Sequence, residues 1–369
     1  MRACDAMLPG LAVTFGTTEG QAAQTVSAFA LAYGVSQLLY GPLGDRFGKL
    51  RVIGLATLGC TLGSAAAALS TNFSELVASR VLNGAAAAGI IPLAMAWIGD
   101  QVPLAGRQEV LARLMGATVV GMVLGQWGGG VVADDGSWRM AFAALAAAFL
   151  IAGTILLRSG GVGPSVGRPA GFQLGYSKVL ADPWARAVLC VTFVEGAFAF
   201  GALAFIATHL HVKHGLAMST AGAVVALYGL GGLAYSRNAG RILARFSAAQ
   251  LAFLGAACLA LSLAVVACAS SWLWAIPACF GAGFGFYALH NTLQTNATQM
   301  APTVSGTAMA SFACVLFLGQ SVGVTVNAWL VDRASTSLVL LASAIGLLLV
   351  GTVFGDLVRR RATAMREAS

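Results

Sequence analysis

The chain has 369 residues, of which 58% are hydrophobic and only 9% are charged, whereas a soluble domain carries about 25% charged residues. So few charges exclude a protein whose whole surface faces water, and a mean hydropathy of +0.83 agrees with that conclusion. The net charge of +8 suggests a nucleic-acid partner, but the placement of the basic residues, described below, explains this charge without one.

The apolar residues come in blocks of about 20, the length of helix that crosses about 30 Å of hydrocarbon. The chain lacks the short alternating strands of a membrane barrel, and backbone polar groups in lipid must then be satisfied within helices. The sequence therefore predicts an all-α integral membrane protein with eleven full transmembrane helices. We expect these spans at residues 21–41, 50–70, 75–99, 110–133, 139–157, 186–210, 219–235, 247–269, 272–296, 305–331 and 336–358.

A shorter apolar stretch, residues 5–16, precedes the first full span. Its 12 residues would form a helix of about 18 Å, too short to cross the bilayer. We interpret it as the second half of a first helix and expect Met1 to lie inside that helix rather than at the true start of the protein. Because residues 158–185 are rich in Gly and Pro, we expect them to form a flexible cytoplasmic linker.

This linker divides the chain into two bundles of six helices, at residues 1–157 and 186–358, followed by a tail at 359–369. The predicted loops alternate in charge, and loops rich in Lys and Arg stay in the cytoplasm. We therefore expect the C-terminus to be cytoplasmic, and the high content of Ala and Gly suggests a bacterial plasma membrane. One set of loops and helix ends holds 16 of the 21 basic residues, and the opposite set holds only Arg139, Lys213 and Arg333.

Residues 41–51 read GPLGDRFGKLR and resemble the signature between helices two and three of the major facilitator superfamily. Leu76, Arg80, Asn83 and Gly84 resemble its fourth-helix signature. The segment GMVLGQWGGG, residues 121–130, resembles the fifth-helix signature of its antiporters, with Gln126 where proline is usual. Residues 4–9, CDAMLP, resemble a first-helix stretch of its drug and sugar efflux branch.

The two halves of the chain also resemble each other. GQWGG at 125–129 matches GQSVG at 319–323, an offset of 194 residues, and residues 41–51 have a weaker counterpart in 232–241. Two echoes at similar offset indicate an internal duplication.

The resemblance implies a secondary transporter in which two six-helix bundles rock around a central cavity. We expect proton-coupled export of a small organic solute, drug-like or sugar-like, by a monomer without a cofactor. One alternative is proton-coupled uptake, and another is a membrane binding or sensory protein that does not transport, which the short first helix favours. An enzyme is not expected, because the sequence has no HExxH motif or other recognisable catalytic arrangement.

The charged cluster in residues 41–51 is predicted to act as a conformational latch between the bundles. Its glycines, among them Gly41 and Gly48, would allow a tight turn. Asp45 would bind the positive end of a neighbouring helix or pair with a base such as Arg46 or Lys49. The alternative is that these charges only set the topology.

Ionisable residues deep inside the predicted apolar segments are costly, which makes them candidates for function. Asp5 and Glu195 lie near the middle of the membrane, and burial favours the protonated form of a carboxyl group, so both are candidates to carry protons. Arg80 would pair with a carboxylate and control its proton affinity. The alternatives are neutral, hydrogen-bonded acids and an arginine that reaches toward the headgroups.

Polar side chains at helical spacing are candidates to line the central cavity, although hydrogen bonds between helices would explain them equally well. Gln126 and Gln320 hold matched positions in the two halves and could face each other. The complete set of cavity candidates is Tyr33, Gln37, Gln126, Tyr287, His290, Asn291, Gln294 and Gln320.

No metal site is expected. The histidines of HLHVKH, residues 209–214, are predicted to lie in an exposed external loop, without an acidic partner that would favour metal binding. The seven cysteines have no metal-ligand spacing and are interpreted as small core residues.

Overall fold

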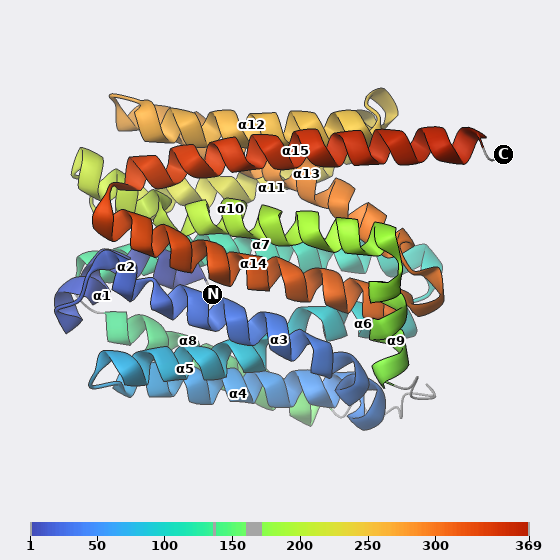
Figure 1. The fold of residues 1–369 in the computed structure, drawn as a ribbon. Helices are drawn as coiled ribbons and strands as arrows, with labels where there is room; N and C mark the ends of the chain where they lie inside the picture. Colours follow the sequence, from blue (N-terminus) through green and yellow to red (C-terminus); the bar gives the residue numbers. More distant parts are fainter. Residues whose placement is uncertain (1, 136–137, 160–171, 368–369) are drawn as a thin grey trace.

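The structure is a computed structural model that describes residues 2–135, 138–159 and 172–367. Within these ranges the regular secondary structure is entirely helical. Eleven helices are long and apolar enough to cross a membrane, and the helix Ala3–Phe15 is apolar but shorter. The long helices lie side by side with their axes roughly parallel (Figure 1), which confirms the predicted all-α membrane fold.

The first half of the chain contains the short first helix and five full spans, two of which are interrupted. Its elements are η1 (Arg2–Met7), α1 (Leu8–Phe15), α2 (Glu19–Ala22), α3 (Gln24–Phe47), α4 (Lys49–Leu69), α5 (Phe73–Ala87), α6 (Ile90–Gln101), α7 (Leu104–Asp134) and α8 (Trp138–Arg158).

The second half contains six spans joined by short turns. Its elements are α10 (Pro183–His214), α11 (Met218–Arg245), α12 (Ala248–Cys268), η2 (Trp272–Trp274), α13 (Ala275–Gln299), η3 (Pro302–Val304), α14 (Ser305–Arg333) and α15 (Thr336–Glu367).

The prediction of a flexible linker is wrong for residues 172–181, which form helix α9 (Phe172–Ala181); residues 160–171 lie outside the described residues. The Tyr176 hydroxyl donates a hydrogen bond to the Leu38 carbonyl in α3 at 3.2 Å. Pro42 has no N–H with which to bond that carbonyl within the helix, so the carbonyl is open to another donor. Burial raises the pKa of the Tyr176 phenol and so favours the protonated form that donates.

The two halves meet along a seam in which α3 packs against α14 and α7 against α11. Glycines allow the close approach: a methyl group at Gly222 would overlap the Gln126 carbonyl, and one at Gly34 would lie 3.0 Å from the Cys314 carbonyl oxygen. Small residues bring membrane helices together in this way because backbone atoms then meet directly.

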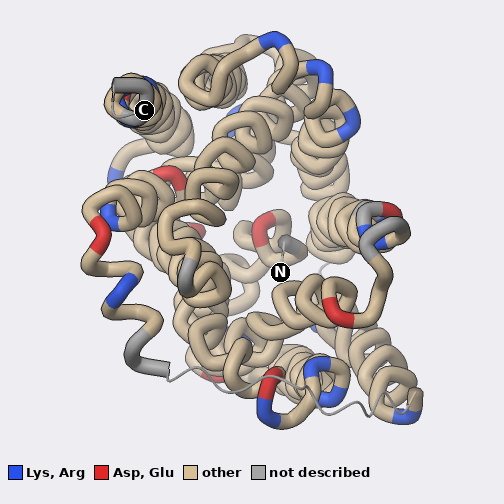
Figure 2. The backbone as a smooth tube through the Cα atoms, turned by 90° about the vertical axis from the view of Figure 1, so that its right-hand side faces the viewer, with Lys and Arg blue, Asp and Glu red and all other residues tan. Residues whose placement is uncertain are grey.

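The two ends of the bundle differ in charge. The C-terminus and α9 lie at one end (Figure 1), and Lys and Arg are spread around the rim of that end (Figure 2). We call it the basic end. We call the opposite end, where α7 ends at Asp134 and α14 at Arg333, the far end.

Candidate functional site

A buried acid and a histidine meet between α10 and α13. The Glu195 side chain is fully buried, and its Oε2 atom lies 3.0 Å from His290 Nδ1. The imidazole stacks on the Phe286 ring, with centroids 5.0 Å apart and an interplanar angle of 12°, and its other neighbour is Phe312. The ring is therefore held in place beside the carboxyl group.

The sequence singled out Glu195 and His290 for different roles, and the structure brings them together. His290 follows Phe286 by one helical turn, which allows the stacking. Glu195 Oε1 has no hydrogen-bond partner among the described residues. The structure thus places a carboxyl group and an imidazole in direct contact inside the bundle, and the role of Glu195 as a proton carrier stays a prediction.

Asp5 is placed similarly in the first half of the chain. It lies in η1 with 1% of its surface exposed, and its Oδ2 atom accepts a hydrogen bond of 3.2 Å from Gln126 Nε2. Gly129 explains how η1 comes so close to α7, because a methyl group there would overlap the Ala3 carbonyl. Gln320 is fully buried in α14, and its amide has no hydrogen-bond partner among the described residues.

Arg80 is 4% exposed in α5. Its Nε donates to the Thr25 carbonyl at 3.3 Å, and its guanidinium lies over the Phe29 ring at 4.5 Å and near the Phe142 ring at 5.7 Å. These contacts stabilise a buried cation by cation–π attraction. The role of Arg80 beside a proton-carrying acid stays a prediction.

The remaining cavity candidates fall into two groups. Tyr33 and Gln37 are buried, and the Tyr33 ring lies 4.3 Å from that of Phe317 across the seam. The others lie on α13 near His290 and are partly exposed, namely Tyr287, Asn291 and Gln294.

The charged cluster at the basic end differs from the loop that we predicted. Helix α3 runs through Gly41, Asp45 and Arg46, and the chain turns only at Gly48, whose φ is 88°. The helix continues past Pro42, and the Leu38 carbonyl, which Pro42 cannot bond, accepts a hydrogen bond from Tyr176 in α9.

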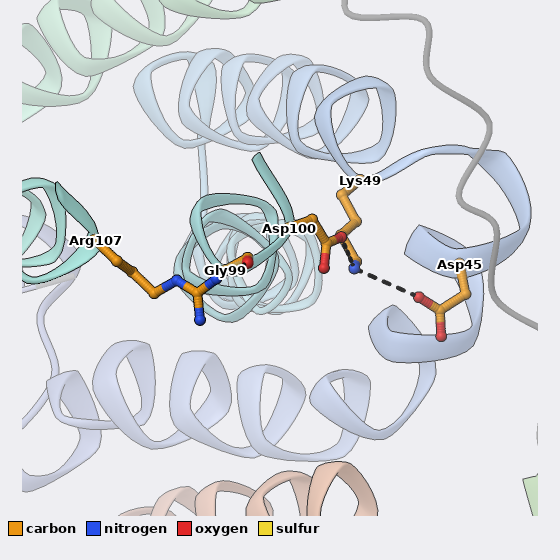
Figure 3. A network of polar contacts seen from close by, with 5 residues as sticks. All are labelled: Asp45, Lys49, Gly99, Asp100 and Arg107. Carbon is orange, nitrogen blue, oxygen red and sulfur yellow. Dashed lines mark hydrogen bonds and ion pairs between the residues drawn. The ribbon is translucent and has the colours of Figure 1, made fainter. Parts of the chain in front are cut away.

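Within this cluster the contacts stay inside the first half. Lys49 binds Asp100 at the end of α6 and lies 3.9 Å from Asp45 (Figure 3). Arg107 donates to the Gly99 carbonyl at 2.6 Å, which fixes the start of α7 against the end of α6. The Arg46 guanidinium lies over the ring of its neighbour Phe47. The function of the cluster as a latch stays a prediction.

The prediction of an external histidine loop is wrong, because α10 continues to His214. His209 is fully buried and lies 2.8 Å from the Thr336 hydroxyl and 3.0 Å from the Val266 carbonyl. His211 instead faces the Leu216 carbonyl at 2.7 Å. The described residues contain no group of three or more His, Cys, Asp or Glu that could hold a metal ion.

Two aspartates at the far end were missed in the sequence. Asp134 and Asp332 each bind donors in the opposite half of the chain. The one sequence feature that could have identified them is their position. Each lies at the end of a long apolar helix, and the two are separated by 198 residues.

The eleven apolar spans of the described residues, arranged in two half-chains with acids buried between them, define a multi-pass membrane protein. The model of the Major Facilitator Superfamily matches residues 5–324. The chain belongs to this superfamily, as its sequence motifs predicted.

Some known proteins resemble the chain in sequence, and others resemble it in fold. The uncharacterized MFS-type transporter YybF of Bacillus subtilis is 26% identical over 141 residues, which cover 38% of this chain and 35% of YybF. The efflux pump dotC of Dothistroma septosporum is 34% identical over 137 residues, which cover 37% of this chain and 23% of dotC. The matches thus span about a third or less of these relatives. The crystal structure of the nucleoside transporter NupG shares the fold, with a TM-score of 0.79, 13% identity, and coverage of 95% of this chain and 94% of NupG.

Proposed function

We propose that the protein is a secondary transporter that exports a small organic solute in exchange for protons, without catalytic activity. Its basic end faces the cytoplasm of a bacterial plasma membrane, because loops rich in Lys and Arg are retained there. The efflux-pump relative supports the direction of transport. The chain works as a monomer whose halves rock along the seam.

The observation that carries the proposal is the contact between Glu195 and His290. A fully buried acid beside an imidazole is costly in a membrane protein and is explained if it binds the coupling proton. Protonation of the pair changes its charge and hydrogen bonding, and so changes which arrangement of α10 and α13 is favoured. Asp5 is the second proton carrier, Arg80 modulates the proton affinity of such an acid, and the cluster around Asp45 is a latch at the basic end.

The test uses the full chain in lipid vesicles with an imposed pH gradient and ethidium, a planar organic cation, as the transported probe. We expect ethidium to move in the direction opposite to the flow of protons. An uncoupler, which removes the pH gradient, should stop this movement. Glu195→Gln should abolish this movement. Glu109→Gln is the matched control, because Glu109 is exposed at the basic end and pairs only with Arg113 among the described residues.

Gradient-driven transport of ethidium by Glu195→Gln at the wild-type rate would remove Glu195 from the mechanism. If wild-type movement followed the protons instead of opposing them, uptake by symport would replace export.

A further inference from the structure

Asp134 joins the two halves of the protein at the far end. It is the last residue of α7, and its carboxylate accepts the Met218 N–H at 2.6 Å and the Ser219 N–H at 2.8 Å. Both donors belong to the first turn of α11, where backbone N–H groups have no partner within the helix. A carboxylate is favoured there by the positive end of the helix. Each oxygen of Asp134 is thus bonded to the opposite half.

Asp332 makes the reverse connection. It lies next to the last residue of α14, and α14 packs against α2. Its carboxylate accepts the Gly20 N–H at 3.0 Å and the Thr18 hydroxyl at 2.7 Å. Here an acid of the second half uses both oxygens on donors of the first half.

The two contacts are reciprocal, and they are related by an offset close to the 194 residues of the internal repeat. Asp134 and Asp332 are separated by 198 residues, and so are Gly20 and Met218. One acid reaches from the first half to the second and the other from the second to the first, as a two-fold axis along the seam would produce.

We infer that Asp134 and Asp332 form a far-end latch, which holds the halves together in the state seen here and must release before the far end opens. Backbone atoms are in direct contact at both places, since a methyl group at Gly130 would overlap the Met218 carbonyl and one at Gly20 the Ala328 carbonyl. Because both acids bind across the seam, rocking the halves apart at this end breaks all four hydrogen bonds together.

The far-end latch is separate from the cluster at the basic end. Asp45, Lys49 and Asp100 all belong to the first half, so their contacts do not hold the halves together in this state. The inference also does not depend on proton binding by Glu195, and its test needs no substrate.

The test replaces each acid by its amide, in Asp134→Asn and Asp332→Asn. An amide has one acceptor oxygen and one NH₂ group, so it keeps at most one of the two bonds and turns an NH₂ toward the other donor. Glu75→Gln is the control, because Glu75 is a far-end carboxylate that binds the Thr71 N–H and hydroxyl within its own half.

The halves are followed by distances between pairs of spin labels, carried on non-canonical amino acids so that the native cysteines stay. One pair is placed at Met140 and Leu338 near the far-end starts of α8 and α15, and the other at Ile155 and Val353 farther along the same helices. All four side chains are exposed, and each pair is separated by 198 residues.

Each Asn variant should increase the ratio of far-end-open to far-end-closed protein about tenfold, equivalent to about 1.4 kcal/mol. The distance between the labels at Met140 and Leu338, the far-end pair, should increase. The distance between the labels at Ile155 and Val353, the basic-end pair, should decrease. Neither distance should change in the control. Wild-type distances in both Asn variants would overturn the inference. So would a longer far-end pair with an unchanged basic-end pair, because that is local loosening. If an Asn variant does not fold, Asp134→Glu and Asp332→Glu, which misplace the carboxylate by one methylene, should shift the distances in the same direction.

Discussion

The glycines near the end of α7 provide a matched test of how closely the halves approach. A methyl group at Gly130 would overlap the Met218 carbonyl and lie 2.9 Å from the Ser219 Cα, inside ordinary van der Waals contact, whereas nothing lies within 4 Å of a methyl group at Gly128. Both residues lie inside the same helix, so Gly→Ala brings each the same gain in helix propensity, about 1 kcal/mol.

Gly128→Ala should therefore raise the free energy of unfolding by about 0.5–1 kcal/mol. Gly130→Ala has the same gain, but overpacking against α11 costs about 1–3 kcal/mol. The two variants should thus differ by about 1–3 kcal/mol, with Gly130→Ala the less stable. The measurement is reversible unfolding of the purified protein in mixed detergent micelles. Equal stabilisation by both substitutions would refute the close approach of α7 and α11.

Three further substitutions test contacts in other parts of the bundle by the same unfolding measurement. His209→Leu should lower the free energy of unfolding by about 1–3 kcal/mol, because the buried Thr336 hydroxyl loses its partner. Arg80→Lys should lower it by about 0.5–2 kcal/mol, because an ammonium group does not stack on the Phe29 ring as a guanidinium does. Lys49→Met should lower it by no more than about 1 kcal/mol, because its acidic partners are half-exposed.

Each of these substitutions has its own contradicting result. Unchanged stability in His209→Leu would mean that its hydrogen bonds contribute nothing net. Wild-type stability in Arg80→Lys would show that charge alone is sufficient there. A loss well above 1 kcal/mol in Lys49→Met, persisting at high salt, would show that the cluster is more than a screened surface pair.

Hydropathy was sufficient to predict the membrane spans, because a helix in lipid must be both apolar and about 20 residues long. It did not predict correctly the residues at which some helices end. Helix α3 extends to Phe47 although Pro42 and two glycines lie in its last turns, and α9 supplies a donor for the Leu38 carbonyl that Pro42 leaves unbonded. A contact between segments so distant in sequence leaves no trace in local composition.

The candidate site shows the same limit at the level of single side chains. Glu195 and His290 were each identifiable, one as an acid inside a span and the other as part of a polar stripe. Their pairing depends on how α10 and α13 are rotated relative to each other, which periodicity within one helix does not report. Asp134 and Asp332 were missed for another reason: an acid at a helix end is ordinary until its partner is known.

The contacts at the two ends of the bundle define which state this structure represents. At the far end two carboxylates bind across the seam, whereas at the basic end Asp45 and Lys49 bind within one half. In alternating access the two ends close in turn, so release of the far-end latch should coincide with closure of the basic end. Asp45 is exposed there and is held only by a 3.9 Å contact with Lys49 among the described residues. If Asp45 acts as the proposed latch, it would exchange this weak contact for donors in the second half, and each end would then have acids that hold it closed in one of the two states.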